Sequence, residues 1–128
     1  MSVNRVILVG NVGRKPEIRY ADRRPVATFS LATNEPGRLL ENGQRTPEIT
    51  EWHNIVMWDR NAEIAERYID KGTKLYIEGK LRTRQWQDRN GLNHTITEII
   101  TDRFDILSRP TVAPGTSGAD ANQNQTQS

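Results

Sequence analysis

The sequence predicts an all-β domain, a small barrel that carries one short helix. Five segments have the apolar spacing of strands, and most of them alternate apolar with polar residues. Helical spacing occurs in one segment, near residues 60–72. The strongest hairpin signal of the chain, Asn90-Gly91, joins the last two strand-like segments. Together these observations indicate a chain built from strands joined by turns.

The first two strands are expected within residues 5–33. "RVILVGNVG" is a continuous apolar run that ends in glycines, which is typical of a strand buried on both faces or of one with a face against another subunit. "PVATFSLAT" has apolar residues at alternate positions and predicts a half-buried strand. Between them the chain is polar and contains two prolines, with room for a short extended piece around Ile18 and Tyr20.

A long connection, the third strand and the helix come next. The stretch from Asn34 to Thr50 is rich in turn residues and predicts a protruding hairpin. "TEWHNIVMW" has strand spacing, and "DRNAEIAERYIDKG" then changes to the spacing of a helix with one apolar stripe. Asp59 or Asn61 fits the start of this helix as a cap, and Gly72 fits its end.

The last two strands form a hairpin. "YIEGKLRTRQWQDRNG" turns at Asp88 to Gly91, and the chain returns as "HTITEIITDRFDIL". The order is therefore three strands, one helix and two strands, which is the order of an OB-fold. We expect a five-stranded barrel over residues 1–109, with the short helix between strands 3 and 4. The 128 residues suffice for one such domain but not for two.

Residues 110–128 differ in composition from the rest of the chain. They have almost no bulky apolar residues, no aromatic residue and one charged side chain, Asp120. Such a segment cannot bury enough apolar surface to offset the entropy lost on ordering. We expect it to be a disordered polar tail.

Composition excludes several classes of function. The chain has no cysteine, which excludes a disulfide framework, a thiolate metal site and a cysteine nucleophile. Its net charge is +2, so a polyanionic partner must be argued from local clusters of charge. The sequence shows no signal peptide and no apolar stretch of transmembrane length, so we expect a cytoplasmic protein.

A tryptophan lies among cations near the end of the fourth strand. The apolar residues of this strand occupy odd positions, so the even positions should share the opposite face. That face then carries Trp86 together with Lys80, Arg82 and Arg84. A single-stranded nucleic acid needs a flat surface for its bases and cations for its phosphates. The alternative is a solvated hairpin whose tryptophan covers an edge of the core.

The other two tryptophans, Trp52 and Trp58, share one parity in the third strand. Stacking on such rings stabilises a complex by ~1–3 kcal/mol per base and tolerates any sequence, because every base has a flat face. The alternative is that one or two of the rings fill the barrel core. Trp58 is the weaker candidate for stacking because it borders the helix.

Signals for an enzyme are weak. His53 and His94 are the only histidines, and a single strand histidine is more often a core or interface residue than a ligand. "GNVG" lacks the Lys-Ser/Thr end of a phosphate loop. Glu98, Asp102 and Asp105 lie near arginines, so ion pairing explains them better than a metal site. We expect no catalysis, no metal and no cofactor.

Five stretches match a known family in sequence and in order: "NRVILVGNVGRKPEIRY", "ATFSLAT", "TEWHNIVMW", "AERYIDKGTKLYIEGKLRTRQW" and "TEI". On these motifs, which span Asn4 to about Leu107, the chain resembles the bacterial single-stranded DNA-binding proteins, the tetrameric OB-fold proteins of replication, recombination and repair. The resemblance implies sequence-independent binding and protection of single-stranded DNA, a homotetramer and a location at the nucleoid.

The resemblance also implies roles for particular residues. By position, the base-stacking aromatics of the family fall on Trp52, Trp58 and Trp86. Its phosphate-contacting basic positions fall on Arg5, Arg19, Arg60, Lys71, Arg82 and Arg84. Its subunit contacts fall on the first strand, with Val6 and Leu8, and on His53.

The chain departs from the family pattern in three places. The connection after "LAT" carries no aromatic residue, where some members have a further stacking tryptophan. Asn54 stands where many members have a basic residue. The sequence ends in "NQNQTQS", without the acidic tip and terminal aromatic through which members recruit other proteins, so we do not expect those partners to bind.

Two other functions fit the same fold. An RNA-binding barrel of the cold-shock type needs similar rings and cations, and competition between DNA and RNA separates the two. A metal-dependent nuclease would cleave bound DNA in the presence of Mg²⁺, and the few carboxylates near the last strand argue against it. The sequence therefore predicts a non-enzymatic protein that wraps single-stranded DNA.

Overall fold

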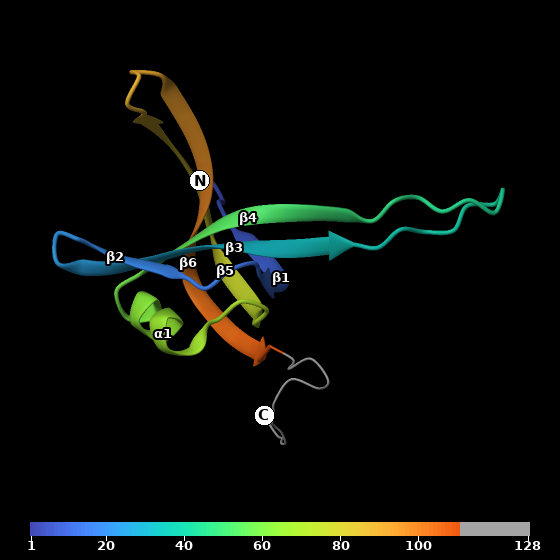
Figure 1. The fold of residues 1–128 in the computed structure, drawn as a ribbon, viewed down its shortest axis with the longest axis horizontal. Helices are drawn as coiled ribbons and strands as arrows, with labels where there is room; N and C mark the ends of the chain where they lie inside the picture. The colour runs from blue at the N-terminus through green and yellow to red at the C-terminus, as the bar shows by residue number, and fades with distance from the viewer. Residues whose placement is uncertain (111–128) are drawn as a thin grey trace.

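Six strands and one helix make up residues 1–110, the part of the chain that the computed structural model describes (Figure 1). The predicted polar tail lies outside these residues apart from Pro110. The expected order is present, with one addition: a short strand, β2, forms where the sequence allows an extended piece. The elements are β1 (Val6–Val12), β2 (Glu17–Ala21), β3 (Arg24–Glu35), β4 (Ile49–Trp58), α1 (Arg60–Tyr68), β5 (Lys74–Gln87) and β6 (Asn93–Ser108).

The sheet closes on itself through β1. Its strand order is β1-β5-β6-β4-β3-β2, and β1 also pairs with β3. Along β1, Val6 to Asn11 pair with β5, and Asn11 and Val12 pair with β3. Five strands thus form a closed ring, the barrel that the sequence predicts, and β2 is added outside the ring as a partner of β3.

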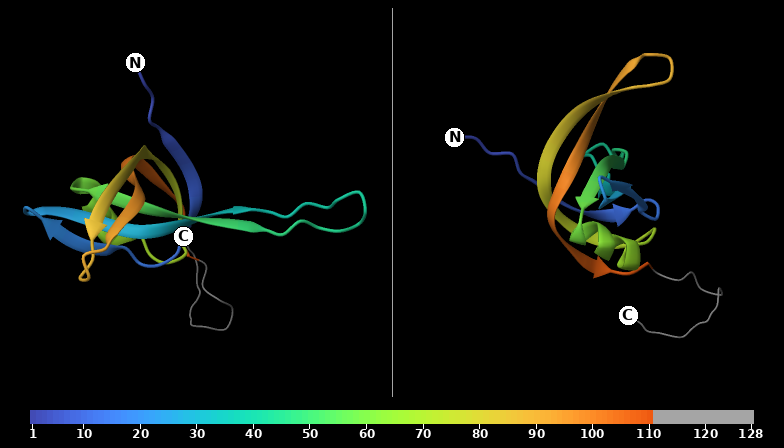
Figure 2. Two further views of the ribbon diagram at one scale, coloured as in Figure 1. Left: turned by 90° about the horizontal axis from the view of Figure 1, so that it is seen from above. Right: turned by 90° about the vertical axis from the view of Figure 1, so that its left-hand side faces the viewer.

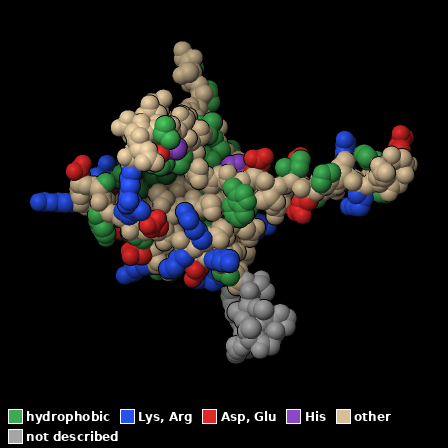
Figure 3. Space-filling view, turned by 45° about the horizontal axis from the view of Figure 1, so that its top comes forward, with side chains coloured by type: hydrophobic (Ala, Val, Ile, Leu, Met, Phe, Trp, Pro, Cys, Tyr) green, Lys and Arg blue, Asp and Glu red, His purple; other side chains and the backbone are tan. Residues whose placement is uncertain are grey.

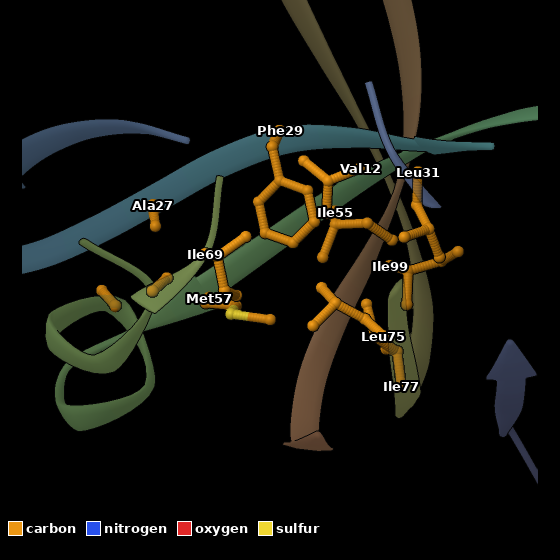
Figure 4. Close-up of a cluster of buried hydrophobic side chains, with 12 residues drawn as sticks. Val12, Ala27, Phe29, Leu31, Ile55, Met57, Ile69, Leu75, Ile77 and Ile99 are labelled. Atoms are coloured by element: carbon orange, nitrogen blue, oxygen red, sulfur yellow. The ribbon is translucent and has the colours of Figure 1, made fainter. Parts of the chain in front are cut away.

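The interior of the barrel is filled by alternate residues of its strands. Phe29 and Leu31 from β3, Ile55 and Met57 from β4, and Leu75 and Ile77 from β5 are buried, and Figure 4 shows these side chains converging. Burial alternates along β5 up to Gly79, as the spacing predicts, but every residue from Lys80 to Gln87 is exposed. The second half of β5 therefore extends beyond the core.

Helix α1 covers the core with the predicted stripe, in which Ala62, Ala65 and the following Ile69 are buried. Asp59 occupies the N-cap position, but its side chain makes no capping hydrogen bond. Its carboxylate instead accepts two hydrogen bonds from Arg24. Gly72 has φ +89° in the turn that follows the helix. Within residues 1–110 no helix has the length and apolar content that a membrane crossing requires.

Two hairpins project from the barrel, as Figures 1 and 2 show. The connection between β3 and β4 is the predicted protruding hairpin, held near its tip by a bridge between Leu39 and Arg45. The β5–β6 hairpin turns at the predicted Asn90-Gly91, where Gly91 has φ +80°. Its turn is closed by the Leu92 carbonyl, which accepts a 3.0 Å hydrogen bond from the Asp88 amide.

Strand β1 differs from one of the two expectations for it. Val6 and Leu8 pack against the core, whereas the side chains of Ile7 and Val9 are 56% and 47% exposed. Burial on both faces is therefore wrong for a single chain. The outer face of β1 remains apolar and uncovered among the described residues.

We predict that Gly10→Ala destabilises the barrel. A Cβ at this position would lie 2.2 Å from the Ala32 carbonyl oxygen, next to the residues where β1 leaves β5 for β3. The free energy of unfolding, measured by urea denaturation, should fall by about 1–3 kcal/mol, the usual cost of overpacking. Gly43→Asn is the matched control: nothing lies within 4 Å of a Cβ at Gly43, and asparagine tolerates its φ of +86°. An equal loss in both variants would contradict the steric argument.

Candidate nucleic-acid interface

The outer surface of the barrel contains a hollow of about 470 Å³ between the β2–β3–β4 side and the β5–β6 hairpin. Its floor is partly apolar, and cations stand around it. Figure 3 shows Lys and Arg side chains gathered over the barrel with a few acidic side chains between them. The lining includes Arg14, Arg19, Val26, Asn54, Val56, Trp58, Arg82, Arg84, Glu98 and Ile100.

Strand register explains why these residues meet. Residues paired across neighbouring strands point to the same face of a sheet. Arg19 pairs with Val26, and Val26 pairs with Trp58, so one row of the face runs from a cation to a ring. Asn54 pairs with Glu98 and Glu98 pairs with Arg82, which forms a second row. Both rows cross the hollow.

All three tryptophans lie on this outward face. Trp52 and Trp58 have the same parity in β4, and Trp86 has the parity of Arg82 and Arg84 in β5. The alternative that one or two of the rings fill the core is not what the structure shows: none of them belongs to the buried cluster. Trp58 lines the hollow, whereas Trp52 and Trp86 lie outside its lining.

Trp58 has a cation over its ring. The guanidinium carbon of Arg24 lies 4.7 Å from the ring centroid, within the range of a cation–π interaction. Asp59 holds that guanidinium through two hydrogen bonds of 3.0 and 2.7 Å. The hydrogen bond from Arg24 lowers the pKa of Asp59, and the same bond raises the pKa of Arg24.

Trp52 lies against the backbone at the end of β1. Its side chain is 60% exposed, and a Cβ added to Gly13 would lie 2.5 Å from an atom of the ring. The Gly13 amide donates a 2.9 Å hydrogen bond to the Ser30 carbonyl, which fixes the backbone at this point. Glycine at position 13 is therefore what allows the ring to lie where it does.

Trp86 stacks on His94 near the end of the β5–β6 hairpin. The two residues are paired across the strands, with ring centroids 4.4 Å apart and planes inclined by 20°. His94 Nε2 lies 2.8 Å from Asp88 Oδ2, and this hydrogen bond is the largest cause of a lowered pKa for Asp88. Trp86 keeps an exposed fraction of 46%.

The two central arginines of β5 differ in their electrostatic surroundings. Arg84 donates two hydrogen bonds, of 3.0 and 3.2 Å, to the carboxylate of Glu98, whose side chain is only 8% exposed. Arg82 makes no ion pair with any residue of the described part of the chain. The positive charge of Arg84 is thus largely offset within the protein, whereas that of Arg82 is available to a ligand.

The other predicted cations do not belong to the lining of the hollow. Arg5 pairs with Glu78 at 2.9 Å, on the β1–β5 side of the barrel. Arg60 begins α1, and Lys71 lies in the turn after it. The hollow therefore brings together Arg19, Arg82, Arg84 and Trp58, and leaves Arg5, Arg60 and Lys71 outside.

Three residues of this face carried no sequence signal for binding. Arg14 lines the hollow, Arg24 covers Trp58, and His94 covers one side of Trp86. The alternation of β6 would place Glu98 and Ile100 on one face, and both do line the hollow. Arg24 could be found only from the pairing of β3 with β4, which are joined by a long connection, whereas the predicted hairpin turn at Asn90-Gly91 brings His94 opposite Trp86.

Ion pairs are expected for three acidic residues near the last strand, and two of them form such pairs in the structure. Glu98 binds Arg84, and Asp105 lies 3.5 Å from Arg103. No three histidine, aspartate or glutamate side chains gather into a candidate metal site within residues 1–110. His53 is half-buried, and its Nε2 lies 2.9 Å from the Thr33 hydroxyl.

Fold and surface together define a class of protein. A closed five-stranded barrel with exposed rings and available cations on one face has what flexible single-stranded nucleic acid needs, namely stacking surfaces and a cationic path. The chain therefore belongs to the nucleic-acid-binding OB-fold barrels.

Comparison with known proteins identifies the family within this class. The model of the single-strand binding protein family matches residues 3–107, so the chain belongs to that family. It is 54% identical over 109 residues to a single-stranded DNA-binding protein of Bacteroides thetaiotaomicron, an alignment that covers 84% of this chain and 68% of the relative. It is 48% identical over 105 residues to one of Rhizobium meliloti, covering 80% of this chain and 60% of the relative.

A solved structure supports the same assignment. The chain superposes with a TM-score of 0.70 and 38% identity on a structure described as a Plasmodium falciparum SSB complex with single-stranded DNA. The match covers 82% of this chain and 93% of that one. The family resemblance and the OB-fold inferred from the sequence are confirmed.

We predict that Arg82 and Arg84 contribute differently to the salt dependence of binding. Arg82→Ala should reduce the slope of log affinity for oligo-dT against log salt by about 0.7, the value for one neutralised phosphate on a single strand. The double variant Arg84→Gln/Glu98→Gln removes a cation and its carboxylate together and should leave the slope nearly unchanged. Pairing the two changes avoids leaving a buried charge without a partner. Equal slopes for the two variants would show that Glu98 does not offset Arg84.

Proposed function

We propose that this protein binds and protects single-stranded DNA without sequence preference, and that it does no chemistry on the DNA. The observation that carries the proposal is the outward face, where Trp52 and Trp86 are exposed and the half-buried Trp58 lines a hollow together with arginines. In the cell it would serve replication, recombination and repair, in the cytoplasm at the nucleoid.

In this proposal the tryptophan rings bind the bases and the basic side chains bind the phosphates. The rings supply flat apolar surfaces, and any base can stack on them because all bases have a π-face. Arg14, Arg19 and Arg82 line the hollow and would receive phosphates between the rings, with Arg19 exchanging its weak, exposed ion pair with Glu17 for a phosphate. Arg5, Arg60 and Lys71 would continue the cationic path over the surface beyond the hollow. The bound DNA would thus face the protein on one side and solvent on the other.

The edges of the bases would be left largely unread. Sequence recognition needs polar groups that are fixed opposite base edges. In the hollow, the side-chain NH₂ of Asn54 donates a 3.3 Å hydrogen bond to the Thr97 carbonyl, and Glu98 accepts hydrogen bonds from Arg84. These two polar groups are therefore occupied by the protein itself.

We predict that the exposed tryptophans stack on bases. Trp86→Ala and Trp52→Ala should each weaken binding of oligo-dT by ~1–3 kcal/mol, the value of one base stacked on one ring. Binding is followed by fluorescence of the remaining tryptophans, with oligo-rU and duplex DNA as competitors. Tyr20→Ala is the control, an exposed aromatic on β2 that does not line the hollow. Normal binding by a tryptophan variant would assign that ring a structural role, and preference for oligo-rU would favour an RNA-binding barrel.

The assembly that we propose is a homotetramer, with residues 1–109 as the binding unit and 110–128 as a tail. Support comes from the outer face of β1, where Ile7 and Val9 are exposed although apolar. A second subunit would cover this face, with the flanking Val6 and Leu8 behind it in the barrel wall and His53 near the contact. Exposed apolar residues in a row are typical of an interface.

We predict that light scattering gives a mass of four chains at micromolar concentration. The double variant Ile7→Glu/Val9→Glu should give smaller assemblies, because it places two charges on the face that another subunit would cover. The Tyr20→Glu variant adds a charge at an exposed position of β2 and should remain tetrameric. A monomeric parent protein, or an unchanged assembly of the double variant, would contradict the proposal.

A further inference from the structure

Two of the three tryptophans share one arrangement of neighbouring side chains. On one side of each ring lies a second planar side chain, and a carboxylate binds that side chain in turn. Trp58 has Arg24 and Asp59; Trp86 has His94 and Asp88. The two units come from different parts of the barrel.

The unit at Trp58 is built on a constrained backbone. Asp59 has φ +56°, a backbone conformation that residues other than glycine rarely adopt. Its amide donates a 2.9 Å hydrogen bond to the Pro25 carbonyl, next to Arg24. In this position the carboxylate makes no capping hydrogen bond to the helix and accepts hydrogen bonds from both Nε and Nη2 of Arg24. The guanidinium is thereby fixed over the ring.

The unit at Trp86 is fixed through the turn of the hairpin. Asp88 Oδ1 accepts hydrogen bonds of 2.8 and 3.0 Å from the amides of Asn90 and Leu92. Its other oxygen, Oδ2, binds His94 Nε2 at 2.8 Å. The imidazole is therefore held from the turn while its face lies on the indole of Trp86.

Fold stability is a weak reason for either unit. Arg24 and Asp59 are both more than half exposed, and exposed ion pairs contribute little to stability. Trp86 lies in the part of β5 where every residue is exposed, so the core does not fix its ring. Without a neighbour such a ring would sample several rotamers, and ordering it on binding would reduce affinity.

We propose that Arg24 and His94 are positioning residues of the DNA site, each of which holds a tryptophan ring ready for a base on its other face. The inference rests on the proposed function and extends it. Neither residue needs to touch DNA, because the tryptophans make the contact. Asp59 offsets the charge of Arg24, and Asp88 is hydrogen-bonded to His94. Each of these two rings then offers one face, and accepts one base.

A double-mutant cycle tests the proposal at the hairpin. His94→Ala should weaken binding of oligo-dT by about three- to tenfold, the loss expected when one more side chain must be ordered on binding. In a Trp86→Ala background the same change should have no further effect, because the ring it positions is absent. His94→Phe keeps a planar partner and should restore affinity to within about twofold. An equal loss in the Trp86→Ala background would show direct contact with DNA, and no loss in the parent would show no role; either result overturns the proposal.

The matched cycle uses Arg24→Ala and Trp58→Ala, with the same expectation. The double variant Arg24→Ala/Asp59→Asn removes the cation together with the carboxylate that offsets it and should leave the salt slope unchanged; a slope reduced by a full phosphate contact would overturn positioning in favour of direct contact. Acrylamide quenching of Trp86 in a Trp52→Phe/Trp58→Phe background gives a readout without DNA. Quenching should rise in His94→Ala and return in His94→Phe, and equal quenching in all three would overturn the proposal.

Failure of the inference is distinguishable from failure of the proposed function. If the parent protein does not bind oligo-dT, or Trp86→Ala binds as well as the parent, the proposed function or the role of that ring fails. If the tryptophan variants lose affinity and the Arg24 and His94 variants do not, only the positioning role fails. Melting temperatures of all variants, measured alongside, separate these results from loss of fold.

Discussion

The passage of β1 from one partner strand to another determines the rest of the structure. At Asn11 the strand leaves β5 and pairs with β3, and this closes the sheet into a ring. Closure requires the β1 backbone to approach Ala32 so closely that Gly10 has no room for a Cβ. Once the ring is closed, one parity of every strand must fill the interior and the other must face outward. The tryptophans and arginines are brought together because they have the outward parity.

Part of the positive charge on the outward face is balanced by neighbouring carboxylates. Arg19 pairs with Glu17, Arg24 with Asp59 and Arg84 with Glu98, so these cations already have partners. A mildly basic chain can therefore present a binding face without a large net positive charge. On the proposed function, the rings would supply much of the affinity, and cations without a partner in the described part of the chain, such as Arg82, would determine the response to salt.

Much of this architecture is predictable from the sequence because strand periodicity is local. Up to Gly79 the odd positions of β5 are buried and the even ones are half-buried or exposed, and the same parity puts Trp86 on the face of Arg82 and Arg84. The sequence indicates strand β2 only as an extended piece, because its turn uses Asp22 and Arg23 at positive φ, where glycine or asparagine would mark a hairpin. The partner of Arg84 depends on pairing with β6, whose register shifts opposite Glu78 and Gly79, and no local pattern indicates it. The roles of Arg60 and Lys71 come from family resemblance alone.

The covered faces of two tryptophans bear on the path that DNA would take. A ring that is open on both sides can insert between neighbouring bases, whereas a ring with one side covered can only end a stack. Arg24 covers one side of Trp58, and His94 covers one side of Trp86. DNA bound to both rings must therefore interrupt its own stacking at each of them. The free energy lost there has to be regained from the rings and from phosphate contacts, so rings that are ordered before binding matter more on this surface than additional charge would.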